Sequence, residues 1–573
     1  MSLAPSFQRL LLPLIAAIAV SIAASCAAHA QARDNRGKEF WVAFMANNGS
    51  GDWDETSQMD LYISCERPTN VTITYHRNGR THAVPIPKAN TPVRVDISRV
   101  FGTGVEIADA ATDSISRRTL KVVAEDEVTL YGANIRTMSA DAFMSLPTDV
   151  LSGRYIVLAY PNGYAEGFDD YDMPSEFVVI ATKNGTTVNI TSPAEINRRP
   201  AKQSFAVRLD SGQAYFAQSS LNGPQDVSGT IINADKPVAV YGGTKRSSIP
   251  VLVGNYRDHL VEQLPPLETW GNEALITPHF PITPQSRYEA VVRVIAASDS
   301  TTWTLDGAPQ PMLRAGKSVE LPLTRAQHIA ASGPILVAQY EHSVGFTELG
   351  DPFMMLIPPP QQFDSIYSFQ CVINDEFVAH YANVVIPSNA ASSLRIDSAA
   401  VRATFRPIPG TRFSYAQIPL AAGAHFARAD STFGLYVYGY GAANSYGYPG
   451  GMLLKDLTPP PPDSLRWADN CGNELIFQSG AMARRNTMMA PFPNPNAGSI
   501  ATLYVGLSSD QQVTVVVSDP LGNVRLRPFD NVPMRGGVGA LQLRLDELPQ
   551  GEYFVQLRTS GGEVMTQKLL IAR

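Results

Sequence analysis

The stretch GTTVNITS, residues 185–192, decides the fold, because its pattern occurs at four places in the chain. Polar Thr and Asn alternate with apolar Val and Ile, and this period of two is typical of a half-buried β-strand. The three related runs are NVTITYH (70–76), STTWTLDG (300–307) and SSLRIDS (392–398). A pattern that returns along the chain predicts a repeated structural unit.

A more apolar run follows each copy and contains at least one Tyr. These runs, EVTLYGANI (127–135), KPVAVYGGT (236–244), GPILVAQYE (333–341) and FGLYVYGYG (433–441), predict interior strands. Three copies are also preceded by an apolar segment that begins with Gly and a polar pair: GKEFWVAFMAN (37–47), GRYIVLAYPN (153–162) and GNEALITPHF (271–280). Each repeat is therefore expected to contain several strands.

Proline-rich joints separate the copies: SLPTDVLSG (145–153), QLPPLETWG (263–271) and LIPPPQQFD (356–364). Proline fixes its own φ and restricts the preceding residue to extended geometry, so these joints are predicted to be rigid, non-helical turns. Only 17% of the residues are charged, and the 42 Gly and 43 Pro favour short strands joined by turns. We therefore predict an all-β fold of tandem β-sandwich-like repeat units over residues 37–457, about four units of roughly 90–120 residues each.

The first thirty residues have the features of a secretory signal peptide. Arg9 precedes an apolar run from Leu10 to Ala24, and Ala28-His29-Ala30 is a small-residue cleavage site. A membrane anchor is the alternative, but the run is Ala-rich and shorter than the ~20 residues of a spanning helix. Cys26 leaves lipidation as a further possibility. With residues 1–30 removed, no transmembrane segment is expected in the mature chain, and its predicted location is extracellular.

Charge and cysteine content exclude several classes of protein. The formal net charge is −7 and the mature chain has no Lys/Arg block, so nucleic acid is not an expected partner. After signal-peptide removal Cys65, Cys371 and Cys471 remain, and no two of them have the C-x-x-C spacing of common zinc sites. Cys65 and Cys371 are expected to be buried apolar residues, while one disulfide among the three remains possible.

The chain changes character after Leu457. TPPPPDS (458–464) opens a Pro-rich linker and bridge over residues 458–489. Residues 490–573 contain alternating runs separated by Gly and Asp turns, which predict a small C-terminal antiparallel β-sandwich.

Five separated blocks carry a resemblance to a known family. GKEFWVAFMAN, LPTDVLSGRYIVLAY, KPVAVYGGTK, DHLVEQLPPLETWG, GDPFMMLIPPPQQF and their order resemble the N-terminal domain of the IgGFc-binding protein family over about residues 37–455. The resemblance implies an extracellular interaction module and supplies no catalytic residues. It names the antibody Fc region as a family ligand, which we do not transfer to this chain.

The C-terminal segment resembles the sorting domain of the type IX (Por) secretion system. The matching features are SDPLGNV, LPQGEYFVQL and KLLIAR, together with a Pro-Asn-Pro opening; the residues concerned are Pro493, Asn494, Pro495, Gly522, Gly551, Lys568 and Arg573. The resemblance implies a bacterium of the Bacteroidetes–Chlorobi kind, with the type IX machinery as a partner and the outer-membrane surface as destination.

No familiar catalytic motif occurs in the chain, and the most acid-rich stretch has a structural interpretation. DHLVEQLPPLETWG brings Asp258, His259 and Glu262 close together, the residue types of acid–base and metal sites. When this stretch is aligned with DAFMSLPTDVLSG (141–153) and DPFMMLIPPPQQF (351–363), only the Asp and the proline recur in all three segments. We therefore interpret the stretch as a joint with a turn-forming Asp and expect no catalytic site there. His342, beside Glu341, is the other acid-flanked histidine.

Two acidic loops are weak candidates for calcium, and no other cofactor is expected. Calcium prefers several oxygen ligands on a turning loop. The candidate ligands are Asp52, Asp54, Asp169, Asp170 and Asp172, although neither loop has EF-hand spacing. Solvated turn carboxylates remain the alternative.

The predicted function is binding. Tyr446 and Tyr448 follow the last apolar run and are expected at the surface, where Tyr provides contact area at low entropic cost. We expect a surface-displayed binding or adhesion protein with an extracellular protein or glycan ligand, and not an enzyme. The alternatives are a secreted hydrolase with an unrecognised active site and a structural surface-layer protein.

Overall fold

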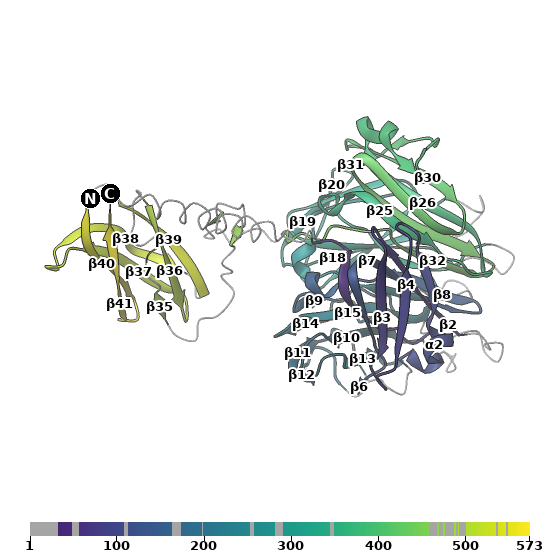
Figure 1. Ribbon diagram of the computed structural model, residues 1–573, viewed down its shortest axis with the longest axis horizontal. Coiled ribbons are helices and arrows are strands. Elements are labelled where there is room, and N and C mark those ends of the chain that lie inside the picture. The colour runs from purple at the N-terminus through teal and green to yellow at the C-terminus, as the bar shows by residue number, and fades with distance from the viewer. Residues whose placement is uncertain are drawn as a thin grey trace, which may run out of the picture. The chain divides into compact units, whose positions relative to one another are not determined.

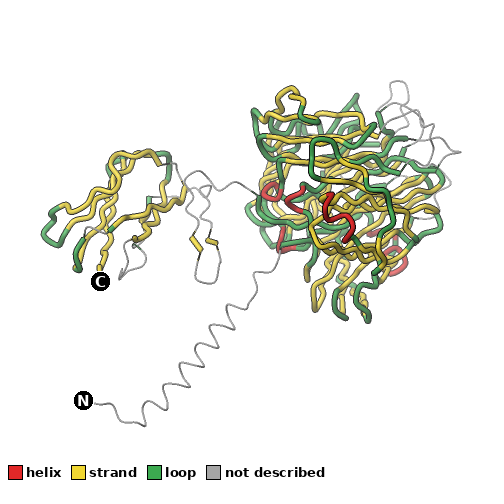
Figure 2. Tube along the Cα trace, turned by 90° about the horizontal axis from the view of Figure 1, so that it is seen from above, coloured by secondary structure: helices red, strands yellow, loops and turns green. Residues whose placement is uncertain are grey.

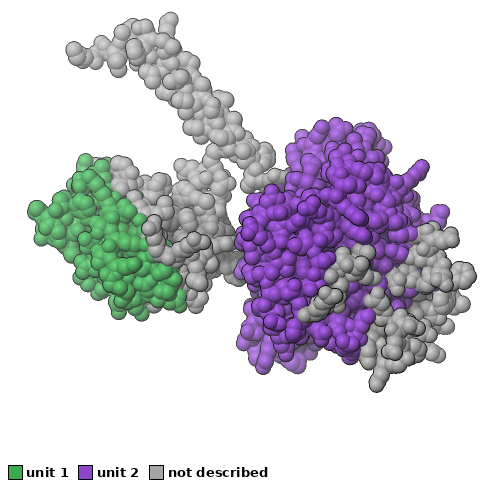
Figure 3. All heavy atoms as spheres, turned by 90° about the horizontal axis from the view of Figure 1, so that it is seen from below, with its two compact units in different colours: residues 1–31, 458–573 green, residues 32–457 purple. Residues whose placement is uncertain are grey.

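The computed structural model describes most of the chain. It covers residues 33–457 apart from 48–56, 108–112, 163–172, 197–198, 252–256, 281–289 and 344–348, and then residues 467–468, 474–475, 486–488, 491 and 500–572 apart from 535–536 and 546–547. Two compact units divide after Leu457 (Figure 3). We call residues 33–457 the repeat region and the described residues from 486 onward the C-terminal sandwich.

Nearly all regular structure in the repeat region is strand (Figure 2). The first repeat contains β1 (Gly37–Val42), β2 (Gln58–Cys65), β3 (Thr69–Tyr75), β4 (Thr81–Ile86), β5 (Val93–Asp96), the short helix α2 (Ile97–Phe101), β7 (Leu120–Arg136) and β8 (Ser139–Met144). The second contains β9 (Arg154–Ile156), β10 (Ser175–Ala181), β11 (Thr186–Thr191), β12 (Ser204–Leu209), β13 (Ala214–Gln218), β14 (Ile231–Ala234), β15 (Val238–Ser247) and β16 (Asp258–Gln263), and its sheet also takes up β6 (Ser114–Ser116).

The third and fourth repeats complete the region. The third contains β17 (Glu273–Ile276), β18 (Ala290–Ala296), β19 (Thr301–Leu305), β20 (Ala308–Leu313), β21 (Ser318–Leu323), β22 (Gln327–Ala331), β23 (Ile335–Tyr340) and β24 (Met354–Leu356). The fourth contains β25 (Asp364–Cys371), β26 (Phe377–Pro387), β27 (Arg395–Ile396), β28 (Ala399–Ala400), β29 (Arg406–Pro407), β30 (Phe413–Leu420), β31 (Gly423–Gly441) and β32 (Asn444–Pro449).

The four repeats share one strand order. Each has an inner antiparallel sheet, with the orders β8-β7-β2-β5, β16-β15-β10-β13, β24-β23-β18-β21 and β32-β31-β26-β30. Each also has an outer sheet, with the orders β1-β7-β3-β4, β9-β14-β11-β12, β17-β22-β19-β20 and β25-β31-β27-β28. The long strands β7 and β31 pass through both sheets, whereas the second and third repeats break the equivalent strand in two. The all-β, sandwich-like prediction is thus confirmed.

The last strand of each repeat lies at the centre of the region. β8 contacts β16 and β32, and β24 contacts the same two strands, so the four central strands close a ring. Figure 1 shows the first-repeat strands β3, β4 and β7 near the viewer and the fourth-repeat strands β25, β26, β30 and β31 above them. The repeats are therefore arranged around a common centre and are not strung out in a line.

Inner sheets are buried on both faces because each lies between its own outer sheet and the neighbouring repeat. In β10, Phe177 and Val179 join the core of the second repeat, while Val178 and Ile180 join the core that contains the first repeat. All seven residues of β10 are buried. Burial on both faces explains why these strands appear in the sequence as continuous apolar runs.

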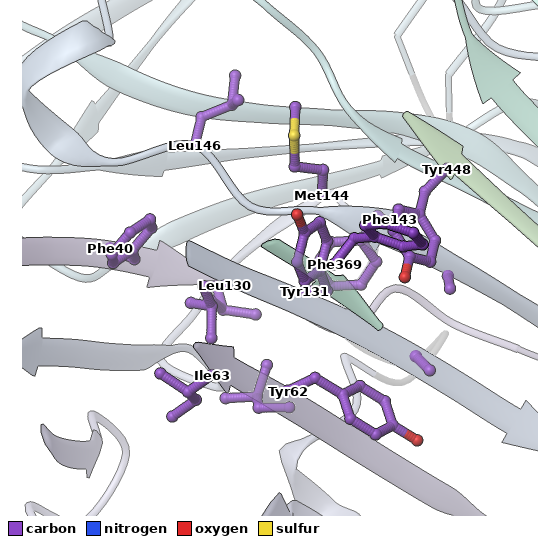
Figure 4. Packing of buried hydrophobic residues seen from close by; sticks show 14 of the residues in the cluster. Phe40, Tyr62, Ile63, Leu130, Tyr131, Phe143, Met144, Leu146, Phe369 and Tyr448 are labelled. Atoms are coloured by element: carbon purple, nitrogen blue, oxygen red, sulfur yellow. The ribbon is translucent and has the colours of Figure 1, made fainter. Parts of the chain in front are cut away.

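The first and fourth repeats close the ring. The Asn35 amide donates to the Met452 carbonyl at 3.1 Å, and the Leu454 amide donates to the Arg33 carbonyl at 2.7 Å. The Tyr131 hydroxyl contacts the Gly450 carbonyl at 2.7 Å, and its ring lies 4.9 Å from that of Tyr448. Figure 4 shows Tyr131, Phe369 and Tyr448 in one cluster, with residues of β7, β25 and β32 side by side.

The proline joints leave the central strands as 3-10 turns: η4 (Thr148–Val150), η5 (Leu267–Thr269) and η6 (Pro360–Gln362). A proline precedes each turn: Pro147, Pro266 and Pro359. The acidic stretch upstream differs from our interpretation, because Asp258–Gln263 is a buried strand and not part of a turn. Its backbone pairs with β15, and this pairing requires extended geometry.

The C-terminal sandwich consists of two further antiparallel sheets. Its strands are the short β35 (Thr487–Met488) and the longer β36 (Ile500–Leu507), β37 (Gln511–Ser518), β38 (Val524–Met534), β39 (Gly537–Arg544), β40 (Gly551–Thr559) and β41 (Val564–Ile571). The short strands β33 (Trp467–Ala468) and β34 (Glu474–Leu475) precede it in the sequence and pair with each other. β37, β38, β40 and β41 share one sheet, and β35, β36 and β39 form the other. The domain boundaries expected at residues 457 and 490 stay predictions. Among the described residues, no helix has the length and apolarity needed to cross a membrane.

Candidate functional site

The predicted calcium ligands Asp52, Asp54, Asp169, Asp170 and Asp172 lie outside the described residues. In the described part of the chain, no group of three or more His, Cys, Asp and Glu residues could hold a metal ion. Calcium binding by these two loops remains a prediction.

The predicted sorting residues are partly described. Gly522 lies in the turn between β37 and β38 with φ +85°, a conformation that favours glycine. Gly551 begins β40, and Lys568 in β41 forms an ion pair with Glu552 at 2.8 Å. Pro493, Asn494, Pro495 and Arg573 lie outside the described residues.

The recurring acidic residues of the joints meet at the centre of the ring. Asp258 and Asn444 begin β16 and β32. Asp141 is the third residue of β8, and Asp351 lies three residues before β24. All four are almost completely buried. The sequence alignment detected the repetition of three of these residues but not their convergence, nor the Asn that takes the fourth position.

Asp141 accepts a hydrogen bond from every central strand. Its Oδ1 accepts the amides of Ala142 at 2.8 Å and Gly447 at 3.3 Å, and its Oδ2 accepts those of Val261 at 3.1 Å and Met354 at 3.0 Å. Burial raises the pKa of Asp141 well above its usual range, and the four amide donors oppose that shift. One side chain thus connects all four repeats.

The other buried carboxyls have fewer partners. Asp258 accepts the amides of Ala140 and His259 through Oδ1, and its Oδ2 has no hydrogen-bond partner. Burial, reinforced by the charge of Asp351, raises the pKa of Asp258 well above its usual range. Burial also raises the pKa of Asp351 and that of Glu262, whose Oε1 accepts the Leu356 amide at 3.1 Å.

The two histidines noted in the sequence are structural. His259 is fully buried with Nδ1 3.1 Å from the Thr244 carbonyl, and burial lowers its pKa to about 4, which keeps the ring neutral. His342 contacts Glu341, whose other oxygen lies 2.6 Å from Nδ1 of His279. These imidazoles lower the pKa of Glu341 despite its burial. The acidic and histidine residues of the centre therefore act within the protein, on backbone amides and on one another.

Further residues identified in the sequence are also buried. Tyr446 and Tyr448 are each 1% exposed, so the expectation that they lie at the surface is wrong. They belong to central strand β32, which pairs with β31 and packs in one core with residues of the first repeat. Cys65 and Cys371 are buried and free, as expected for small apolar residues, and Cys471 lies outside the described residues.

A hollow of about 940 Å³ is open to solvent at the boundary of the third and fourth repeats. Its residues come from β17, β22, η6, the end of β26, the 3-10 turn Ser388–Ser393, the turn before β30, the first residue of β30, and β31. Its lining is Glu273, His328, Pro360, Gln361, Pro387, Ser388, Asn389, Gly410, Thr411, Arg412, Phe413, Ser431 and Thr432. We call it the seam hollow. Sequence reasoning missed it because its residues span some 160 positions and share no motif.

Polar and apolar groups both line the seam hollow. His328 Nε2 lies 2.9 Å from Glu273 Oε1 on the third-repeat side. Arg412 is exposed on the opposite side, with its guanidinium carbon 5.3 Å from the centre of the Phe413 ring. The hollow can exchange hydrogen bonds with a ligand, whereas the central carboxyls are enclosed.

Four β-sandwich repeats closed into a ring, with an open hollow between two of them, define an all-β repeat protein. The sequence also matches the family described as "IgGFc binding protein" over residues 141–439, just over half of the chain. The chain belongs to this family, which is a family of binding proteins.

A relative supports the same assignment. The human IgGFc-binding protein is 25% identical over 421 residues, which are 72% of this chain and 7% of the human protein. This chain therefore spans a small part of that relative.

Two solved structures show weak likeness. Dimeric latent PorU from Porphyromonas gingivalis is 11% identical, covers 58% of this chain and 31% of its own, and has a TM-score of 0.13. A tetra-tandem repeat from the extending region of a large adhesion protein is 11% identical, covers 78% and 95%, and has a TM-score of 0.12. TM-scores of this size carry no weight for fold or function.

Proposed function

We propose that this chain is an exported extracellular binding protein whose repeat region binds a protein or glycan ligand. The family match over residues 141–439 carries the proposal, since it extends through most of the second, third and fourth repeats. The enclosed carboxyls agree with it, because those of Asp141, Asp258 and Glu262 accept the protein's own backbone amides. The match covers only 7% of the human relative, so we treat immunoglobulin as one ligand to be tested among others.

A binding array tests this function. The mature chain, from residue 31 onward, is labelled and applied to immobilised extracellular proteins, immunoglobulin Fc and glycans. Saturable binding that competes with unlabelled chain supports the proposal. Absence of saturable binding to every class contradicts it.

We further propose that residues 1–30 direct export and that residues 490–573 are a type IX sorting domain. The sequence features at both ends support this proposal, as does the sandwich of six principal strands over residues 500–571. The chain then reaches the outer-membrane surface with the type IX machinery as its transport partner. Cell fractionation with and without residues 490–573 tests it: loss of surface display on deletion is expected, and unchanged display refutes the sorting function.

A further inference from the structure

The seam hollow has the dimensions of a ligand site. Its volume of about 940 Å³ lies at the upper end of the ~300–1,000 Å³ range of small-molecule sites. It is open to solvent, which leaves room for a ligand that extends beyond it. The Phe413 ring is only 6% exposed, so the apolar surface open to a ligand there comes mainly from other residues.

The lining groups match the chemistry of a saccharide. The side-chain hydroxyls of Ser431 and Thr432 and the amides of Gln361 and Asn389 line the hollow. The hydroxyls of Ser388 and Thr411 also lie there, but both are already hydrogen-bonded to neighbouring backbone groups. Such groups both donate and accept hydrogen bonds, as sugar hydroxyls do. The rings of Pro360 and Pro387 add rigid apolar surface against which the C–H face of a sugar can pack.

Charge in the hollow is divided between its two sides. Glu273 on the third-repeat side is hydrogen-bonded to His328 at 2.9 Å and has a side chain 31% exposed, so it can still accept from hydroxyls. Arg412 on the fourth-repeat side forms no ion pair with any described residue, and its guanidinium is available for a planar bidentate acceptor. This separation orients a ligand with its anionic group toward Arg412 and its hydroxyls toward Glu273.

We infer that the seam hollow binds an oligosaccharide that carries a carboxylate, with Arg412 receiving the carboxylate. The inference rests on the proposed binding function and specifies its ligand class. Residues of the third and fourth repeats contribute together, so the site exists only where the ring brings them into contact.

Calorimetric titration of the mature chain tests the inference. The probes are a uronate-containing hexasaccharide, a sialylated oligosaccharide and a neutral hexasaccharide of similar length. At least one acidic probe is expected to bind more tightly than the neutral one. Arg412→Gln should weaken that binding about tenfold or more, as expected for loss of a charged bidentate contact. Arg412→Lys should restore part of it.

Arg208→Gln supplies the matched control, because Arg208 is an exposed arginine on β12 of the second repeat. It should leave the affinity unchanged, and thermal melting should show that all variants remain folded. The inference is refuted if no acidic probe binds, or if Arg412→Gln and Arg208→Gln affect binding equally. If the chain binds a protein on the array but no acidic saccharide in the calorimetric titration, the proposed binding function is supported and only the saccharide site in the seam hollow is refuted.

Discussion

Replacing Asp141 with Asn should destabilise the ring more than the same replacement at Asp258. In Asp141→Asn, one side of the side chain keeps an acceptor oxygen, and the other becomes an NH₂ group. Two buried backbone amides, those of Val261 and Met354 or of Ala142 and Gly447, then lose their acceptor. An unsatisfied buried donor costs about 1–3 kcal/mol, so two cost about 2–6 kcal/mol of the free energy of unfolding.

Asp258→Asn is the matched control at the equivalent strand position. Asp258 uses Oδ1 alone, and its Oδ2 has no partner, so Asn can keep both hydrogen bonds and place NH₂ at the unpaired position. The replacement exchanges one unpaired buried polar group for another and removes a buried ionisable group, so the stability at neutral pH should stay close to that of the wild type.

Urea unfolding of residues 31–457, followed by tryptophan fluorescence, measures both variants. Asp141→Asn should shift the midpoint downward by an amount equivalent to about 2–6 kcal/mol. Equal effects of Asp141→Asn and Asp258→Asn would refute the claim that Asp141 connects the four strands.

Three further predictions concern pH, packing and calcium. The raised pKa values of Asp258, Glu262 and Asp351 mean that the folded state holds protons that the unfolded chain releases. The contribution of these bound protons to the free energy of unfolding is complete below the pKa of an exposed carboxyl, which is about 4. As the pH rises toward the pKa values of the folded state, this contribution is lost by up to about 1.4 kcal/mol per pH unit for each group. Urea midpoints should therefore fall between pH 5 and 8, with a smaller slope in Asp258→Asn, and a rise over this range would contradict the assignment. A Cβ at Gly132 would lie 2.3 Å from the Phe143 ring, so Gly132→Ala should lower the free energy of unfolding, measured with urea, by about 1–3 kcal/mol. Gly104 has open space around it, so Gly104→Ala should cost little. Equal losses in the two variants would argue against close packing of β7 on β8. If the acidic loops around Asp52 and Asp169 bind calcium, the ion should raise Tm and a chelator should reverse the rise. A Tm that changes with neither calcium nor chelator would contradict calcium binding.

The sequence was sufficient to predict the elements but not their closure into a ring. GTTVNITS corresponds to β11 (Thr186–Thr191) and NVTITYH to most of β3 (Thr69–Tyr75), because alternation depends on which face of a strand is buried, and this is a local property. SSLRIDS became only the two-residue strand β27, since a 3-10 turn at Ser388–Ser393 occupies its beginning.

Long-range contacts determined the rest. Tyr448 was expected at the surface because it follows a Gly-rich turn, yet its strand is enclosed by residues more than 300 positions away in the sequence. The recurring Asp was visible as a repeat, but its partners were not, since Asp141 accepts amides from residues 261, 354 and 447. The seam hollow likewise joins Glu273 to Arg412 across a repeat boundary. Periodicity reports burial of one segment and contains no information about which distant segment covers it.

The most direct test of the central claim compares the two compact parts of the chain on one array of extracellular proteins and glycans. Residues 31–457 and residues 490–573 are labelled identically and titrated. Saturable binding by the repeat region and none by the C-terminal sandwich is predicted. Absence of saturable binding by residues 31–457, or equal binding by both parts, would contradict the conclusion that the ring of four repeats is the binding module.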